Sequence, residues 1–176
     1  MSSAIAFTIP EVPVAKGRAR AMARAVKMGG VWKAIVQLVT PKETRDAEAR
    51  LQAIARGVVG DRPPLDGPVR MTIVAVFPVP PSWPQAVRRA MMAGVVFHTS
   101  KPDADNLAKL VGDGLNAIAY QDDSQVAELI VRKRYGFPSR TEVAIAPLKS
   151  AVETPADKRR APPPARVEPA NVPTLL

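Results

Sequence analysis

Residues 101–116 read Lys-Pro-Asp-Ala-Asp-Asn-Leu-Ala-Lys-Leu-Val-Gly-Asp-Gly-Leu-Asn, and this stretch decides the local fold and the chemistry that we expect. On a helix that begins near Asp103, each residue advances by about 100°. One arc of that helix is polar and holds Asp105, Lys109, Asp113 and Asn116. The opposite side is apolar and holds Leu107, Leu110, Val111 and Leu115. The pattern therefore predicts a helix that packs on a core and shows carboxylates to solvent.

A second group of acids follows this helix closely. Asp122 and Asp123 precede a predicted strand over residues 125–135, and a short turn would bring them back beside the helix start. Carboxylates that are pressed together repel one another, and a bound divalent cation relieves that repulsion. Because the chain has no cysteine and a single histidine, His98, the ligands would be oxygens, which favours Mg²⁺ or Mn²⁺ over zinc. Such an ion can activate water beside a phosphate, and Lys109 can add positive charge there.

Each of these residues also has a simpler structural interpretation. Asp103 can be a helix cap, and Asp105 and Lys109 can form an exposed ion pair. The acidic pair can be a plain turn. His98, a lone histidine at a strand end, is more typical of a structural residue and stays outside the predicted site.

The rest of the chain reads as short strands and helices. Apolar and β-branched runs predict strands over residues 4–9, 31–39 and 69–77, and a closing strand over 141–146. Thr40, Pro41 and Glu43 have the order of a helix start with a capping box, for a helix that runs to about Arg56. Ser82 can cap another helix over residues 83–92. On the strand after the acidic pair, Ala127, Leu129 and Val131 share the side that we expect to face the core, and Glu128, Arg132 and Arg134 share the exposed side.

Composition bounds the function. The chain of 176 residues fits one domain, over residues 1–148, followed by a proline-rich tail over 149–176 that we expect to be disordered. No apolar run is long enough to span a bilayer and no signal peptide is visible, so we expect a cytoplasmic protein without a membrane role. Lys and Arg number 25 against 16 Asp and Glu, a net charge of +9, which favours a nucleic-acid partner.

The basic residues gather near the N-terminus. Between residues 12 and 42 lie seven Lys or Arg and no acid. Phosphate contacts, which position a nucleic acid without reading its sequence, are predicted for Lys16, Arg18, Arg20, Arg24, Lys101, Arg132 and Arg134. Trp32 and Trp83 suit core packing better than stacking on unpaired bases, which is the alternative for both.

The motifs together resemble the RusA family of Holliday junction resolvases. Residues 101–109, 113–116 and 122–126 match its signatures K-P-D-x-D-N-L-x-K, D-x-L-N and D-D-x-Q-V. Residues 16–20 resemble the basic K-G-R-x-R segment near the family's N-terminus, and the resemblance spans about residues 7–146.

This resemblance implies a site and an activity. Its catalytic, Mg²⁺-binding aspartates fall on Asp103, Asp105 and Asp123, with Asp122 able to share the last role, and its catalytic lysine falls on Lys109. It also implies an α/β (α+β) fold with a small mixed sheet and flanking helices, a homodimer, and a bacterial or phage source. The implied enzyme is a Mg²⁺-dependent endodeoxyribonuclease of DNA recombination and repair, which nicks two strands of a four-way junction.

Two alternatives to this activity stay open. One is a nuclease of the same fold that acts mainly on flaps or forks. The other is a non-catalytic nucleic-acid-binding protein whose acidic residues are structural.

Overall fold

The computed structural model describes residues 4–149, so almost all of the predicted tail over 149–176 lies outside the described residues. Its body is a four-stranded mixed sheet in the order β1 (Ile5–Ile9), β6 (Arg140–Pro147), β4 (Val69–Phe77), β5 (Val126–Tyr135). β6 runs antiparallel to both of its neighbours, whereas β4 and β5 are parallel. The predicted α+β class with a small mixed sheet is confirmed.

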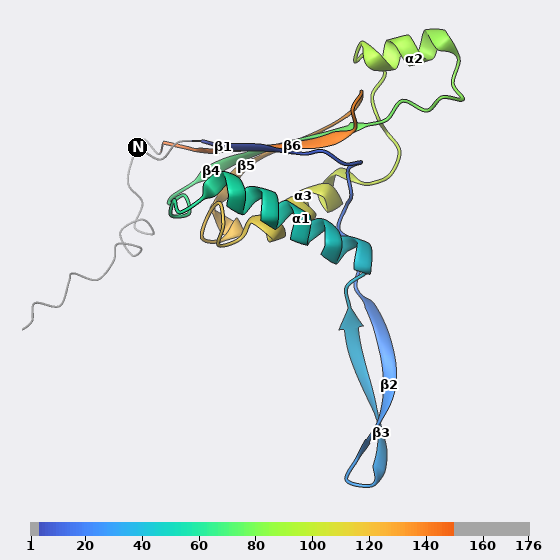
Figure 1. Ribbon diagram of the computed structural model, residues 1–176, viewed down its shortest axis with the longest axis vertical. Coiled ribbons are helices and arrows are strands. Elements are labelled where there is room, and N and C mark those ends of the chain that lie inside the picture. Colours follow the sequence, from blue (N-terminus) through green and yellow to red (C-terminus); the bar gives the residue numbers. More distant parts are fainter. Residues whose placement is uncertain (1–3, 150–176) are drawn as a thin grey trace, which may run out of the picture.

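Two helices, α1 (Lys42–Val59) and α3 (Ala104–Leu115), cover one face of this sheet (Figure 1). The strand register places the inward side chains in rows across the sheet. Phe7 pairs with Val143, which pairs in turn with Ile73, and all three are buried. From the helices, Leu51 and Leu115 are fully buried in the same apolar cluster. The apolar arc predicted for α3 is therefore the face that closes the core.

The predicted starts of two helices are wrong in detail. α1 has Pro41 at its N-cap position with no side-chain cap hydrogen bond, so the Thr40–Glu43 capping box is absent. Here β3 runs almost directly into the helix, and Thr44 instead accepts a hydrogen bond from the incoming chain at Gly17. α2 (Gln85–Met92) likewise begins after Pro84 rather than at residue 83, without a cap from a side chain.

The hairpin of β2 (Arg20–Met28) and β3 (Val31–Val39) stands away from the body (Figure 1). Its strands pair with each other and form a sheet separate from the main one. The turn uses Gly29 and Gly30, both with positive φ, as a tight hairpin turn requires. β3 has the predicted bounds, whereas β2 was not predicted, because alternating alanine and arginine carry a weak strand signal.

The predicted core side of β5 is only partly confirmed. Val131 packs against the core, but Leu129 is 52% exposed and Ala127 is also exposed. β5 lies at the edge of the sheet, and its register shifts next to Ala127, where Val69 pairs with Val126 but Arg70 pairs with Glu128. In the part of the chain that the structure describes, no helix is long and apolar enough to cross a membrane.

Candidate active site

Helix α3 presents the polar arc that its sequence predicts. Asp105, Lys109 and Asp113 are exposed, while the leucines and Val111 of the other side are buried. Asn116, which follows the helix, is half-buried. The arc is thus a row of carboxylates and one ammonium on the surface of a helix that the core holds in place.

The start of α3 carries two exposed aspartates. Asp103 occupies the N-cap position in an extended conformation, but its side chain makes no cap hydrogen bond. Asp103 therefore lies at the predicted cap position, but its carboxylate does not make the hydrogen bond of a cap. Asp105 lies in the first helical turn, where Lys109 donates a hydrogen bond of 3.2 Å to its carboxylate. This hydrogen bond lowers the pKa of Asp105, so its carboxylate is ionised at neutral pH.

Lys16 connects the N-terminal segment to the middle of α3. Its backbone N–H donates to the carbonyl of Asn106 at 3.0 Å. Its ammonium pairs with Asp113 and lies 3.6 Å from Glu48 of α1. The hydrogen bond with Asp113 raises the pKa of Lys16. Lys16 was predicted to contact phosphate. Its ammonium instead pairs with Asp113 and Glu48 of its own chain, because its segment lies directly on α3.

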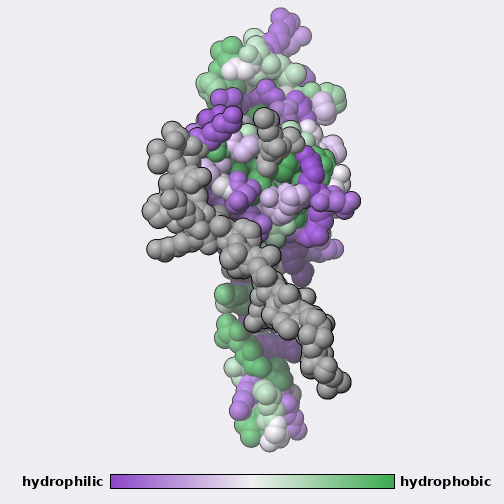
Figure 2. Space-filling model, turned by 90° about the vertical axis from the view of Figure 1, so that its left-hand side faces the viewer, coloured by the Kyte–Doolittle hydropathy of each residue, from purple (hydrophilic) through white to green (hydrophobic). Residues whose placement is uncertain are grey.

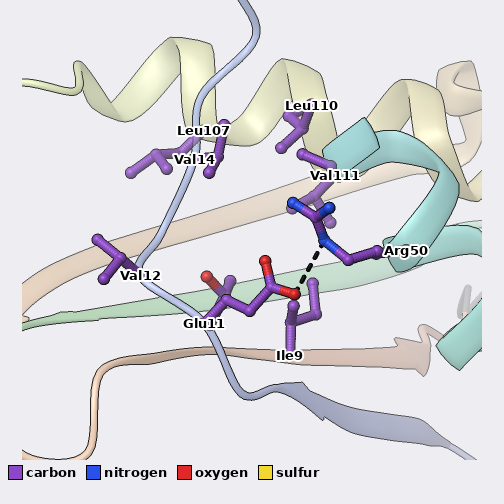
Figure 3. Close-up of a pocket in the computed structure, with 10 residues that line it drawn as sticks. Ile9, Glu11, Val12, Val14, Arg50, Leu107, Leu110 and Val111 are labelled. Carbon is purple, nitrogen blue, oxygen red and sulfur yellow. Dashed lines mark ion pairs between the residues drawn. The ribbon is translucent and has the colours of Figure 1, made fainter. Parts of the chain in front are cut away.

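The segment from Ile9 to Val14 lines a small pocket together with residues of α1, α3 and β6 (Figure 3). Leu107, Leu110 and Val111 line this pocket from the helix, and Arg50 of α1 forms an ion pair of 2.9 Å with Glu11 across it. These contacts hold the crossing segment beside the start of the candidate site.

Gly17 continues this anchor at the base of the hairpin. Its N–H donates to the Oγ1 of Thr44 at 2.9 Å. A Cβ at this position would lie 2.9 Å from the same oxygen and 3.0 Å from a ring carbon of Pro41, so a larger residue would push the segment away. The Lys-Gly pair of the basic N-terminal motif is therefore an element that positions the hairpin against α1 and α3.

The acidic pair after α3 is divided between two roles. Asp122 caps the short 3₁₀ turn η1 (Asp123–Gln125), with its carboxylate accepting from the N–H of Ser124 at 2.9 Å. Gln125 is buried, accepts from the N–H groups of Gln121 and Asp122, and donates to the carbonyls of Leu65 and Gly67. Asp123 is exposed at the start of the turn. The capping network thus holds Asp122 for structure and presents Asp123 to solvent.

The buried Tyr120 shows where this pair lies relative to the helix. Its hydroxyl donates to the carbonyl of Gly112 at 2.8 Å. Burial raises its pKa, and the negative charges of Asp123, Asp113 and Asp122 raise it further. The pair is therefore beside the second half of α3, not beside its start as expected from the short turn. The reason is that Tyr120 enters the core and holds the turn at that end.

Asp103 and Asp105 are consequently separated from Asp123 within one chain. A helix rises by about 1.5 Å per residue, so Asp105 and Asp113 differ by roughly 12 Å along α3. Across residues 4–149, no group of three or more acidic, histidine or cysteine side chains is close enough to hold one ion. The expected three-aspartate cluster does not form in a single chain.

The other predicted basic residues lie in three places. Arg18 precedes the hairpin, and Arg20 and Arg24 are on β2, all exposed. Lys101 is exposed in the loop before α3. On β5, Arg132 and Arg134 are exposed as predicted, but Arg134 is 3.3 Å from Glu142 of β6.

One further contact near the site was not predicted from the sequence. Lys133 of β5 donates to the carbonyl of Ser100 at 2.6 Å and so ties the loop before α3 to the sheet. In the same loop His98 stacks on Phe77, with ring centroids 3.8 Å apart. Burial, and then the charge of Lys133, lower the pKa of His98. His98 is therefore a structural residue, as its lone occurrence indicated.

The start of α3 fits a hard divalent cation of the Mg²⁺ type. Such an ion is commonly bound by one or two carboxylates and completes its octahedral shell with water and phosphate oxygens of a substrate. Asp103 and Asp105 are two exposed carboxylates, and the first is not used as a cap. Nitrogen or sulfur ligands, which zinc prefers, are limited to His98, which packs against an aromatic ring.

Comparison with known proteins agrees with these motifs. The sequence model of the family described as Endodeoxyribonuclease RusA matches residues 10–146. The chain is also similar to the uncharacterized protein YqaN of Bacillus subtilis (strain 168). The two are 35% identical over 145 residues, which cover 80% of this chain and 94% of YqaN.

Proposed function

The chain belongs to the RusA family of endodeoxyribonucleases, and from that premise we propose that it resolves four-way DNA junctions by paired, Mg²⁺-dependent nicks. Family membership supports an endonuclease that acts on branched DNA. The paired nicks, the metal dependence and the roles of single residues are the proposal. A bacterial or phage protein that works in DNA recombination and repair is the setting that the family implies.

The start of α3 is the observation that carries the proposal. Asp103 and Asp105 are exposed there, the carboxylate of Asp103 makes no cap hydrogen bond, and Lys109 lies one turn beyond on the same surface. A purely structural helix start would use Asp103 as its cap. We assign Asp103 and Asp105 as the residues that hold Mg²⁺, which Mn²⁺ can replace. When bound, such an ion activates water and neutralises charge that develops on the scissile phosphate.

Lys109 has a separate role in this proposal. Its ammonium lies on the carboxylate of Asp105, which keeps that carboxylate ionised and aligns the two groups at the helix surface. A fixed positive charge there stabilises negative charge on the phosphoryl oxygens in the transition state.

The functional unit in our proposal is a homodimer. Symmetric nicks in two strands require two sites, and a C₂ dimer supplies them. Asp123 follows Tyr120 by three residues, and the hydroxyl of Tyr120 is bonded to Gly112 in the second half of α3, away from the helix start in its own chain. We therefore assign Asp123 to the other active site of the dimer, so that each site contains Asp103 and Asp105 of one subunit and Asp123 of the partner subunit.

Cleavage of a labelled, immobile four-way junction tests the activity, with a linear duplex and a flap in parallel. Paired nicks in opposite strands of the junction alone, lost in Asp105→Asn while binding persists, are the expected result. Cleavage of the flap but not of the junction would keep the chemistry and replace the substrate. Binding without cleavage in either Mg²⁺ or Mn²⁺ would overturn the enzyme and leave a DNA-binding protein.

A complementation experiment tests the shared site. Asp105→Asn and Asp123→Asn chains are co-expressed, so that mixed dimers have one doubly substituted site and one intact site. With random pairing, about one site in four is intact, and nicking should return to about that fraction of the wild-type rate. The control mixture of Asp103→Asn with Asp105→Asn has no intact site in any dimer. If neither mixture nicks the junction while each variant still binds it, each chain holds a whole site.

A further inference from the structure

The β2–β3 hairpin is a basic arm that leaves the body next to the candidate site. Its strands hold Arg20, Arg24, Lys27 and Lys33, and no acid occurs between Glu11 and Glu43. Lys16 and Gly17 anchor the base of the arm on α3 and α1, because their backbone N–H groups donate to the carbonyl of Asn106 and to the Oγ1 of Thr44. A polyanion bound at the start of α3 would therefore lie at the base of the hairpin, whose charged side chains are all positive.

The strand register divides the four cations between the two faces. Arg20 and Arg24 are on the same side of β2, and Lys33, which pairs with Val26, is on that side too. From Arg20 to Val26 a strand extends by about 20 Å. Phosphates follow one another by about 3.4 Å per strand along a duplex, so this basic face spans about six of them. Exposed apolar residues lie between these cations on the same face, namely Met22, Met28, Val31 and Ile35. The opposite face is apolar apart from Lys27.

The tip of the arm is aromatic and exposed. Trp32 is 68% exposed and pairs across the hairpin with Lys27, next to the turn at Gly29 and Gly30. Figure 2 shows hydrophobic and hydrophilic residues side by side on this projection. The sequence favoured core packing for Trp32, and this prediction is wrong, because its side chain is exposed in the structure. An exposed indole with an adjacent cation is a surface on which an unpaired base can stack.

We propose that the β2–β3 hairpin is a DNA arm that recognises the branch point. Its basic face, with Arg20, Arg24 and Lys33, follows the phosphates of one duplex arm away from the cleavage site. Its tip places Trp32 against bases that are unstacked where the strands cross. The occupant follows from charge complementarity, because every charged side chain on the two strands is positive and suits phosphates. The inference rests on the proposed function, since it names the part of the molecule that distinguishes branched from linear DNA.

Salt dependence of junction binding tests the basic face. Dissociation constants are measured between low and moderate salt in an Asp105→Asn background, so that the junction stays intact. Arg24→Gln with Lys33→Gln should lower the slope of log K against log salt by about 1.8, because each lost phosphate contact contributes about 0.9. The control is Arg56→Gln with Lys149→Gln, two exposed cations outside the arm, whose slope should equal that of the parent.

Binding of junction and duplex tests the tip. Trp32→Ala should weaken junction binding by about tenfold or more, leave duplex binding unchanged, and be partly rescued by Trp32→Phe. In a Trp83→Phe background Trp32 is the single tryptophan, and its fluorescence should be quenched by the junction and not by the duplex.

Other outcomes overturn the inference in distinct ways. If the wild type binds and cleaves the junction but the hairpin variants bind DNA as their own parents do, the arm is not a DNA contact and the proposed function stands. If Trp32→Ala dissociates the protein into monomers in light scattering, with the salt slope of Arg24→Gln and Lys33→Gln unchanged, the apolar face binds a second copy instead. If the parent binds no DNA, both proposals fail.

Discussion

Two glycines on α3 should respond in opposite directions to the same substitution. Gly112 and Gly114 both lie in the helix interior, where glycine costs about 1 kcal/mol relative to alanine. At Gly112 a new Cβ would meet the Cε of Met71 at 3.8 Å and the hydroxyl of Tyr120 at 3.9 Å, which are ordinary contacts. Gly112→Ala should therefore stabilise the protein by about 0.5–1 kcal/mol.

At Gly114 the new Cβ would lie 2.2 Å from the Cδ2 of Leu51, which is fully buried on α1. Leu51 would have to leave its rotamer or α1 would have to shift, and overpacking of this kind costs about 1–3 kcal/mol. The helix propensity of alanine offsets about 1 kcal/mol of that cost. Gly114→Ala should be less stable than wild type by about 1 kcal/mol, and less stable than Gly112→Ala by about 2 kcal/mol.

Thermal and denaturant unfolding measure this difference. For a chain of this length 1 kcal/mol moves the Tm by roughly 2–4 °C, so the two variants should differ by about 4–8 °C. In a Leu51→Ala background the clash is removed, and Gly114→Ala should then become neutral or stabilising, which a double-mutant cycle detects. The reasoning is refuted if Gly114→Ala stabilises the wild-type protein as much as Gly112→Ala does.

Three further predictions concern polar groups that are buried or half-buried. Gln125→Leu should destabilise the protein by about 2–4 kcal/mol in urea unfolding, since it leaves the N–H groups and carbonyls that Gln125 serves without their partner; an unchanged midpoint would contradict the capping network. Tyr120→Phe removes the hydrogen bond to Gly112 and should cost about 1 kcal/mol, and a neutral result would show that this hydroxyl contributes nothing. The pKa of His98 is lowered, so its neutral form stabilises the fold above about pH 6.5 and that contribution is lost as the pH falls through the folded pKa. Wild type should therefore lose more stability than His98→Asn between pH 7 and pH 5, and parallel curves would refute this.

Local sequence was sufficient to predict those structural properties that depend only on residues adjacent in the chain. The strands over residues 31–39 and 69–77 have their predicted bounds, because β-branched runs between turn residues specify them. Helix ends were harder to predict: Thr40 and Ser82 had the composition of caps, but neither α1 nor α2 has a side-chain cap. The path of the chain into each helix decides whether a hydroxyl can reach the first N–H groups, and that path is a tertiary property.

The role of Lys16 shows the same limit for function. A lysine in a basic segment predicts a phosphate contact, yet its ammonium pairs with Asp113 and Glu48. These partners are distant in sequence, and only the crossing of the N-terminal segment over α3 brings them together. Pro10, Pro13 and Gly17 indicate turns in this segment, but they do not predict which helix it crosses.

By itself the sequence determined the two faces of α3 and the set of acids and the lysine on its outer surface. The period of an α-helix is a local property, so the spacing of Asp103, Asp105 and Lys109 places them at one helix start. The tertiary structure decided that Asp123 lies at the other end of that helix and that the hairpin stands off the body. The place of Asp123 depends on the burial of Tyr120, and the place of the hairpin depends on the anchoring of Gly17. Both are contacts between residues distant in the sequence, so no local pattern predicts them.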